Sequence, residues 1–198
     1  MAARVEASAD VSDAADLGDG TTVWHLAQVR EGARLGRNCV VGRGAYVGPG
    51  VTIGDNCKLQ NYALVYEPAV LGDGVFVGPA AVFTNDYFPR AVTPDGVLKR
   101  GDDWDRVAVT CLEGASIGAR AVCVAPVTIG RWALVGAGSV VIHDVPDFAL
   151  VAGAPARRLR WVGRAGAPLD ADGDGQWVCP QTGERYVERD GVLSESHT

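Results

Sequence analysis

Two polar residues, Glu67 and Asn85, are the first candidates for chemistry in this chain of 198 residues. They are 18 residues apart, and each is the third residue of a six-residue unit that begins with an apolar side chain, Val65 or Phe83. A carboxylate and a carboxamide brought together in this way can grip a polar substrate beside the loop that follows. The alternative is that both are exposed turn residues, for which Glu and Asn are ordinary choices. We predict a substrate-binding pair.

A second set of residues suits a ligand that carries phosphates. Its first part is a stretch with almost no side chains, Gly136, Ala137, Gly138 and Ser139. Its second part is an arginine cluster that includes Arg157 and Arg158. A backbone-lined groove that ends in arginines fits a long, thin molecule such as coenzyme A, and free amide N–H groups in it would stabilise a thioester oxyanion. The alternatives are that the small residues only turn the chain and that the arginines form a solvated surface.

A six-residue repeat positions both sets. From Val23 to Phe83 every sixth residue is apolar, and with one exception the residue four places later is small or β-branched. The pattern lapses after Phe88 and resumes from Cys111 to Val141. A period of six fits neither an amphipathic helix nor a simple strand, and it predicts a parallel β-helix, an all-β fold. With three units in each coil, residues 18 apart stack at the strand spacing of about 4.8 Å, so the carboxylate and the carboxamide are predicted neighbours.

The lapse in the repeat also divides the chain into regions. The expected regions are a lead-in at 1–22, a β-helix at 23–146 with an excursion loop over 89–110, a C-terminal capping-helix region at 147–164 and a tail with a small β-hairpin at 165–198. The capping helix is expected because Pro155 falls in the first turn of a short apolar and basic run, where proline is tolerated. Long loops inside a compact repeat array are usually functional when they are ordered.

Two of the three histidines, His25 and His143, lie within the repeat region. His25 shares a predicted column with Arg43 and Asn61. The place of His143 depends on the register across the excursion: if Cys111 starts the third face of the interrupted coil, His143 lies two coils beyond Asn85 in the same column, and otherwise it lies on another face. A histidine on a turn is more often a solvated surface residue than a base.

Composition limits the classes of function. The formal net charge of −6 argues against general nucleic-acid binding. No apolar run approaches the ~18 residues of a membrane span, and the first residues lack the apolar core of a signal peptide, so a cytoplasmic protein is expected. Four of the five cysteines fall on inward-facing repeat positions, which indicates buried filler. No metal site is expected, because the acidic segment 170–175 lacks the glutamate that an EF-hand loop needs.

The most characteristic segments are short, and they are Val23-Trp24-His25, Gln60-Asn61, Val65-Tyr66-Glu67, Val82-Phe83-Thr84-Asn85, Pro89-Arg90, Gly114–Ala119, Gly136–Val141 and Val151–Ala156. Together they resemble the bacterial sugar-nucleotide N-acetyltransferases, a group of hexapeptide-repeat acyltransferases, over about residues 22–164. The resemblance is strongest to enzymes that acetylate the 3-amino group of a UDP-linked 2-acetamido-3-amino-2,3-dideoxy-glucuronic acid for cell-surface polysaccharide. The bare hexapeptide pattern is shared by many acyltransferases, and the Trp-His and Phe-Thr-Asn segments are more selective.

The resemblance implies a left-handed winding, a homotrimer with active sites between subunits, and acetyl-CoA as the donor along the outer wall of the later coils. It implies direct attack of the neutral sugar amine on the thioester, with Asn85 close to the amine. Since the chain has no histidine between His25 and His143, the proton would leave to water, to the departing thiolate, or through Glu67 or Asp86.

The site residues follow from this resemblance. The expected catalytic residues are Asn85 and Glu67. The residues expected to bind the nucleotide sugar are Tyr66, Thr84, Asp86, Arg90 and His25. The residues expected to bind acetyl-CoA are Gly136, Ala137, Gly138, Ser139, Arg157 and Arg158.

Other interpretations stay open at this point. A non-catalytic scaffold trimer has the same repeat, but in such a protein the Asn85 column and the arginines would have no function. A γ-type carbonic anhydrase needs three zinc-binding histidines, and the central coils of this chain have none. Among acyltransferases, a dTDP-linked 3-amino sugar is the nearest rival acceptor, and a hydroxyl acceptor would normally require a histidine base.

Overall fold

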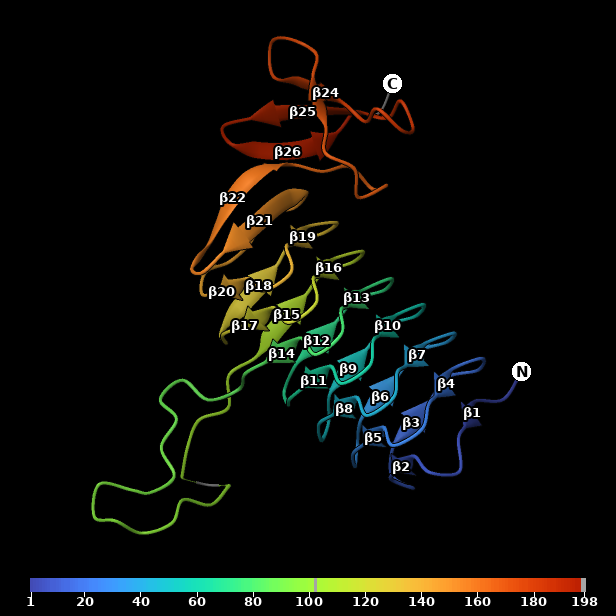
Figure 1. The fold of residues 1–198 in the computed structure, drawn as a ribbon, viewed down its shortest axis with the longest axis vertical. Helices are drawn as coiled ribbons and strands as arrows, with labels where there is room; N and C mark the ends of the chain where they lie inside the picture. The colour runs from blue at the N-terminus through green and yellow to red at the C-terminus, as the bar shows by residue number, and fades with distance from the viewer. Residues whose placement is uncertain (102, 197–198) are drawn as a thin grey trace.

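The computed structural model describes residues 1–101 and 103–196, in which short strands wind into a long parallel β-helix (Figure 1). Face A contains β1 (Arg4–Val5), β4 (Thr22–Val23), β7 (Val40–Val41), β10 (Lys58–Leu59), β13 (Phe76–Val77), β16 (Ser116–Ile117), β19 (Leu134–Val135) and β21 (Ala149–Gly153). Face B contains β2 (Asp10–Val11), β5 (Gln28–Val29), β8 (Tyr46–Val47), β11 (Leu64–Val65), β14 (Val82–Phe83), β17 (Val122–Cys123) and β20 (Val140–Val141). Face C contains β3 (Asp16–Leu17), β6 (Arg34–Leu35), β9 (Thr52–Ile53), β12 (Val70–Leu71), β15 (Val109–Cys111) and β18 (Val127–Ile129).

The repeat builds this architecture through its inward-facing residues. From β4 to β20 the last residue of each strand points into the interior, where Val23, Leu59 and Phe83 are fully buried. Four residues later a small side chain such as Ala27 fills the corner, where a larger one would collide with the coil. Strand pairing joins residues 18 apart, as in Leu64↔Val82. The predicted β-helix and its 18-residue stack are confirmed.

Residues 1–22 form a full first coil, so the predicted lead-in is wrong. The strands β1, β2 and β3 pair in parallel with β4, β5 and β6 of the next coil. Val5, Val11 and Leu17 continue the six-residue period backwards from Val23. These three side chains are only partly buried or exposed, because no coil stacks against their N-terminal side.

The capping helix predicted at 147–164 is also wrong. This region forms β21 and β22 (Ala156–Trp161), which pair in antiparallel fashion, and no helix occurs in residues 1–101 or 103–196. The physical reason is the free edge of β21, whose backbone N–H and C=O groups are satisfied by a returning strand. Gly153, at φ +101°, adopts a backbone conformation that other residues rarely reach, and with Pro155 it makes the tight return.

The tail forms a small antiparallel sheet on the C-terminal end of the β-helix (Figure 1). Its strands are β23 (Asp170–Ala171), β24 (Gln176–Val178), β25 (Arg185–Arg189) and β26 (Val192–Glu195). The pairing of β24 with β25 confirms the predicted hairpin, which two further strands extend. The ring of Tyr186 packs edge-on against Phe148, with centroids 5.4 Å apart, so the sheet covers the apolar end of the solenoid.

The excursion leaves the solenoid after β14 and returns at β15, and Figure 1 shows it (green) projecting well away from the coils. The strand β15 takes up residues 109–111, so the last two residues of the predicted excursion belong to the solenoid. The pairing Leu71↔Cys111 places the chain on face C when it returns. This register decides the place of His143, which falls in the column of Asn85.

The cysteines behave as the repeat predicts. All five are free and buried, and Cys39, Cys57, Cys111 and Cys123 belong to the core. In the described part of the chain, no helix is long and apolar enough to span a membrane. The same residues contain no group of three or more side chains placed to hold a metal ion.

Candidate functional site

One column of side chains follows the B–C corner, defined as the turn after each strand of face B. The register of β11, β14, β17 and β20 aligns the third residue of each unit, which gives the row Glu31, Pro49, Glu67, Asn85, Ala125 and His143. Asn85 therefore lies one coil beyond Glu67, toward the C-terminal end, as predicted. The backbone of Asn85 accepts a hydrogen bond from the N–H of Val107 at 3.0 Å, which holds the mouth of the excursion loop against this column.

Glu67 carries the most unusual polar atom of the column. Its Oε2 atom is buried and, among the described residues, has no hydrogen-bond partner. The carboxylate lies over Gly48, where an added Cβ would be 2.6 Å from Oε2 and 2.8 Å from the Glu67 nitrogen. Only glycine at this position leaves room for the carboxylate. Since an unsatisfied buried acceptor is costly, the site is suited to a hydrogen-bond donor from outside the chain.

Two tyrosines adjoin this carboxylate. The rings of Tyr46 and Tyr66 lie with centroids 5.0 Å apart, and Tyr66 remains partly exposed. Burial, followed by the negative charge of Glu67, raises the pKa of Tyr46. Tyr46 is thus a neutral hydroxyl beside the carboxylate. The sequence analysis predicted a role for Tyr66 but not for Tyr46. The repeat places Tyr46 on a strand one coil before Tyr66, so its position near Glu67 could have been predicted.

Three residues predicted to bind the nucleotide sugar have other contacts in the structure. The Thr84 hydroxyl accepts a hydrogen bond from the N–H of Ala125 at 3.0 Å and so links two coils. Asp86 accepts one from the N–H of Phe88 at 2.9 Å, which shapes the start of the excursion. Arg90 is exposed on that loop and donates to the neighbouring carbonyl of Pro89. The structure does not bring Arg90 to the Glu67–Asn85 pair.

The excursion loop contains a cavity that the sequence did not reveal. Its volume is about 410 Å³, and its lining residues are Asp86, Tyr87, Phe88, Lys99, Trp104, Asp105 and Val107. It adjoins Asn85 through the two loop ends, Asp86 and Val107. Aromatic rings with one cation and two carboxylates suit a sugar or a nucleobase, which offers a flat or apolar face and a polar edge.

His25 lies at a different corner of the same chain, the A–B corner, defined as the turn after each strand of face A. It lines a cavity of about 330 Å³ with Trp24, Arg43, Gln60 and Asn61. The Nδ1 atom of His25 is 2.9 Å from the Ser8 hydroxyl, and its Nε2 atom is 3.6 Å from Glu6. The hydrogen bond to Ser8 therefore fixes one face of the ring, with Glu6 nearby. A single chain does not bring His25 to Asn85.

The glycine-rich stretch also lies at the A–B corner, near the C-terminal end. Gly136, Gly138 and Ser139 donate their amide N–H groups to the carbonyls of Val151, Ala119 and Gly136. The prediction that these amides are free to hold an oxyanion is therefore wrong for these three residues. Ser139 is fully buried, and its hydroxyl accepts from the N–H of Gly153 at 3.2 Å, so its side chain faces the fold. Gly138 and Ala137 still leave a wall without large side chains.

The two predicted arginines are presented by β22 rather than by a helix. The Arg158 guanidinium lies 4.2 Å from the centroid of the Trp161 ring, and Arg157 donates to the carbonyl of Ala156 at 2.9 Å. Both arginines line one cavity of about 210 Å³, and His143 lines the same cavity. The sequence considered His143 and the arginines separately, because only the antiparallel return of β22 brings them together.

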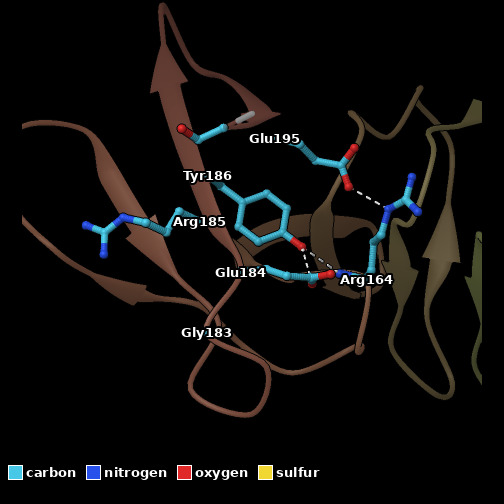
Figure 2. A pocket seen from close by; sticks show the side chains of 7 residues that line it. Arg164, Gly183, Glu184, Arg185, Tyr186 and Glu195 are labelled. Atoms are coloured by element: carbon cyan, nitrogen blue, oxygen red, sulfur yellow. Dashed lines mark hydrogen bonds and ion pairs between the residues drawn. The ribbon is translucent and has the colours of Figure 1, made fainter. Parts of the chain in front are cut away.

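A cavity of about 550 Å³ lies where the tail sheet meets the β-helix (Figure 2). Two polar contacts cross it: Arg164 contacts Glu195 at 2.5 Å, and the Tyr186 hydroxyl donates to Glu184 while it accepts from the Arg164 N–H at 3.0 Å. Burial is the main cause that raises the pKa of Tyr186 to about 12. We interpret this region as the contact that anchors the tail.

Comparison with known proteins finds the same six-residue repeat. Residues 50–85 match the bacterial transferase hexapeptide family (six repeats), and residues 32–62 and 113–142 match the hexapeptide repeat of succinyl-transferase. The matched segments of the chain carry the hexapeptide repeat of these families. The matched residues include Glu67 and Asn85, so these two members of the column lie within a segment that carries the family pattern.

Two relatives illustrate the range of this similarity. A dTDP-3-amino-3,6-dideoxy-alpha-D-galactopyranose 3-N-acetyltransferase of Aneurinibacillus thermoaerophilus is 49% identical over 83 residues, which cover 42% of each chain. A serine acetyltransferase of Haemophilus influenzae is 40% identical over 86 residues, 42% of this chain and 31% of the relative. The matches thus span less than half the length of these relatives.

Two solved structures extend the comparison. A hexapeptide-repeat acetyltransferase of Vibrio cholerae, solved with acetyl coenzyme A, has a TM-score of 0.50 and 26% identity, covering 67% of this chain and 72% of its own. A UDP-N-acetylglucosamine acyltransferase of Bacteroides fragilis has a TM-score of 0.64 at 16% identity, covering 80% of this chain and 61% of its own. The second likeness concerns the fold alone.

Proposed function

We propose that this hexapeptide-repeat protein is an acetyl-CoA-dependent N-acetyltransferase that acts on the amino group of a nucleotide-linked amino sugar. The observation that carries the proposal is the buried carboxylate oxygen of Glu67 without a partner among the described residues, in the same column as Asn85, which lies one coil further on at the mouth of a loop cavity. An amine that enters here meets an acceptor for its N–H groups, and the loop offers aromatic rings for the sugar or the base.

The comparisons support this choice of substrate class. The Aneurinibacillus relative is named for acetylation of a 3-amino group on a dTDP-linked sugar, and it is 49% identical over the matched segment. The Vibrio structure is described as a complex with acetyl coenzyme A. We propose a 3-amino sugar as the acceptor, with UDP as the nucleotide and dTDP as the rival.

The reaction forms one bond and breaks one. The lone pair of the sugar amine attacks the acetyl carbonyl carbon, the carbon–nitrogen bond forms, and the carbon–sulfur bond of the thioester breaks. Glu67 takes the proton that the amine loses and returns it to solvent, and the coenzyme A thiolate takes up a proton from solvent water as it leaves. Asn85 orients the amine through its carboxamide oxygen. This direct attack forms no acyl-enzyme, and every cysteine of the chain is buried.

The residues present fit acetyl-CoA at the C-terminal coils. The Arg157 and Arg158 side chains supply cations for its phosphates, and the wall at Ala137 and Gly138 leaves space for the thin part of the molecule. Acetyl-CoA supplies the acetyl group as a thioester. The nucleotide sugar would occupy the coils on the N-terminal side of the donor.

A homotrimer completes the proposal. Outside the cavity, the excursion loop exposes apolar side chains in the single chain, with Leu98 at 62%, Val97 at 60% and Val92 at 44% of their surface accessible. A patch of this kind is typical of a surface that packs against another subunit. A neighbouring subunit would also place a second corner opposite the Glu67–Asn85 pair, which explains why His25 lies apart from it within one chain.

The test is thiol release from acetyl-CoA with a panel of UDP- and dTDP-linked 3- and 4-amino sugars. We expect release with a 3-amino sugar, and the preferred nucleotide then identifies the acceptor. Release with a free hydroxyl compound such as serine, and with no amino sugar, would replace the proposal by an O-acetyltransferase. Absence of release together with absence of coenzyme A binding would favour a non-catalytic scaffold.

A further inference from the structure

One hydrogen bond recurs between turns of successive coils. The second residue after a strand donates its backbone N–H to the side-chain oxygen of the residue above it in the next coil, at 2.7–2.9 Å. The examples are Arg37 to Asp55, Arg43 to Asn61, Asp55 to Asp73 and Arg131 to Asp147. A glycine precedes each donor and makes room for the accepting side chain: an added Cβ on Gly42 would be 2.8 Å from Oδ1 of Asn61.

The turn below Glu67 has the same form, but its donor is missing. Gly48 and Pro49 follow β8 and take the places of the glycine and the donor. The Oε2 atom of Glu67 lies where the accepting oxygens of the other turns lie, since an added Cβ on Gly48 would be 2.6 Å from it. Proline has no backbone N–H. This explains why Oε2 is buried without a hydrogen-bond partner among the described residues.

The missing hydrogen bond changes what the Glu67 side chain can do. Hydrogen bonds to ionised groups are stronger than those between neutral groups, so a carboxylate held like that of Asp55 loses a strong bond when it turns toward a ligand. Glu67 loses no such bond. Because Oε2 is buried, the side chain has to turn outward before this oxygen can meet an amine, and the proline lowers the free-energy cost of that rotation.

We propose that Pro49 is a positioning residue for acetyl transfer: it withholds an N–H from the turn and so leaves the Glu67 carboxylate free to accept from the sugar amine. The inference rests on the proposed function. Pro49 acts through Glu67 and needs no contact with the substrate. The alternative is that the proline only shapes the turn, and the chain offers a second proline that separates these two roles.

Gly78 and Pro79 provide the matched control, because they follow β13 as the first glycine and proline follow β8. The residue above them is Ala119, whose nitrogen would be 2.6 Å from an added Cβ on Gly78. Alanine has no side-chain acceptor. An N–H introduced at position 79 therefore gains no side-chain partner from the next coil, whereas an N–H at position 49 gains the Glu67 carboxylate.

The experiment compares Pro49→Ala with Pro79→Ala by crystal structure and by thiol release from acetyl-CoA. In Pro49→Ala we expect the nitrogen of residue 49 to lie 2.7–2.9 Å from a Glu67 carboxylate oxygen, as in the other turns. The kcat should fall about 10- to 100-fold, with the KM for acetyl-CoA unchanged. Pro79→Ala should keep kcat within about twofold of wild type. In a Glu67→Gln background Pro49→Ala should change kcat by less than about twofold, because its effect passes through the carboxylate.

The melting temperature separates this role from a structural one. Both variants lose a proline and only Pro49→Ala gains a hydrogen bond, so it should melt no lower than Pro79→Ala. A wild-type kcat despite the new hydrogen bond overturns the inference, and so does a structure in which that bond fails to form. An equal loss of rate in both proline variants, or a loss that persists in the Glu67→Gln background, also overturns it, while acetyl transfer by the wild type stands. Absence of transfer by the wild type overturns the proposed function, and the role of Pro49 falls with it.

Discussion

Replacing Glu67 by glutamine tests the proposed chemistry most directly, because it keeps the shape of the side chain and removes its charge. The Oε2 atom has no hydrogen bond to lose within the described residues. We therefore expect the free energy of unfolding to change by less than about 1 kcal/mol. A positioned base contributes about 10²- to 10⁴-fold to the rate, so kcat should fall by that factor, which corresponds to about 3–5 kcal/mol of barrier.

A spectroscopic readout shows independently that the charge has been removed. Burial is the larger cause of the raised pKa of Tyr46, and the negative charge of Glu67 is the next. Glu67→Gln should therefore lower the pKa of Tyr46 while burial still keeps it above its ordinary value. Titration of tyrosinate absorbance, with Tyr46→Phe to identify the signal, measures this shift.

The assay is the initial rate of thiol release at saturating acetyl-CoA and acceptor, together with the melting temperature. Glu31→Gln is the matched control, because Glu31 occupies the same column two coils away and is paired with Arg30 at 3.0 Å. Its kcat should equal that of wild type. A kcat for Glu67→Gln within twofold of wild type would refute the role of the carboxylate. A loss of rate that accompanies a large fall in melting temperature would show a structural role instead.

Three further predictions concern other parts of the molecule. Asn85→Ala should lower kcat at least tenfold and leave the oligomeric state in size-exclusion chromatography unchanged; wild-type kcat would exclude Asn85 from the amine site. The double variant Arg157→Ala with Arg158→Ala should raise the KM for acetyl-CoA about tenfold or more without changing the KM for the acceptor, and an unchanged donor KM would remove both from the phosphate site. Tyr186→Phe should lower stability by about 1–2 kcal/mol in denaturant unfolding, because the N–H of Arg164 loses its acceptor, and an unchanged midpoint would contradict this account.

The β-helix could be predicted from the sequence because its core is set by local, regular positions. Every inward residue from Val23 to Phe83 obeys one period, and strand pairing follows from that period alone. The first coil carries the same signal at Val5, Val11 and Leu17, so its strands were predictable in principle. The strand β22 was not, because antiparallel pairing depends on the free edge of β21, a non-local feature that overrides the local tendency of the segment.

Some features of the candidate site were likewise predictable from the repeat, and others depend on packing that the repeat does not specify. The 18-residue stack was enough to place Asn85 beside Glu67, since both lie on the regular part of the coil. The orphan oxygen of Glu67 could not be predicted, because it depends on how the carboxylate packs over Gly48. The meeting of His143 with Arg157 required both the register across the excursion and the return of β22. Sequence periodicity therefore predicts columns, while the atoms that each side chain contacts depend on departures from the repeat.

The axial arrangement of these features makes the proposed roles separable by kinetics. The Glu67–Asn85 pair lies in the central coils, and the cavity lined by His143, Arg157 and Arg158 lies at the C-terminal end. Two strand spacings, roughly 10 Å, separate Asn85 from His143. Residues at such separations that share no contacts change free energies nearly additively. A variant that combines Glu67→Gln with Arg157→Ala and Arg158→Ala should thus show the kcat loss of the first change and the raised KM for acetyl-CoA of the other two. Strong non-additivity would instead mean that the two regions respond as one unit, which a ligand held along the column between them would produce.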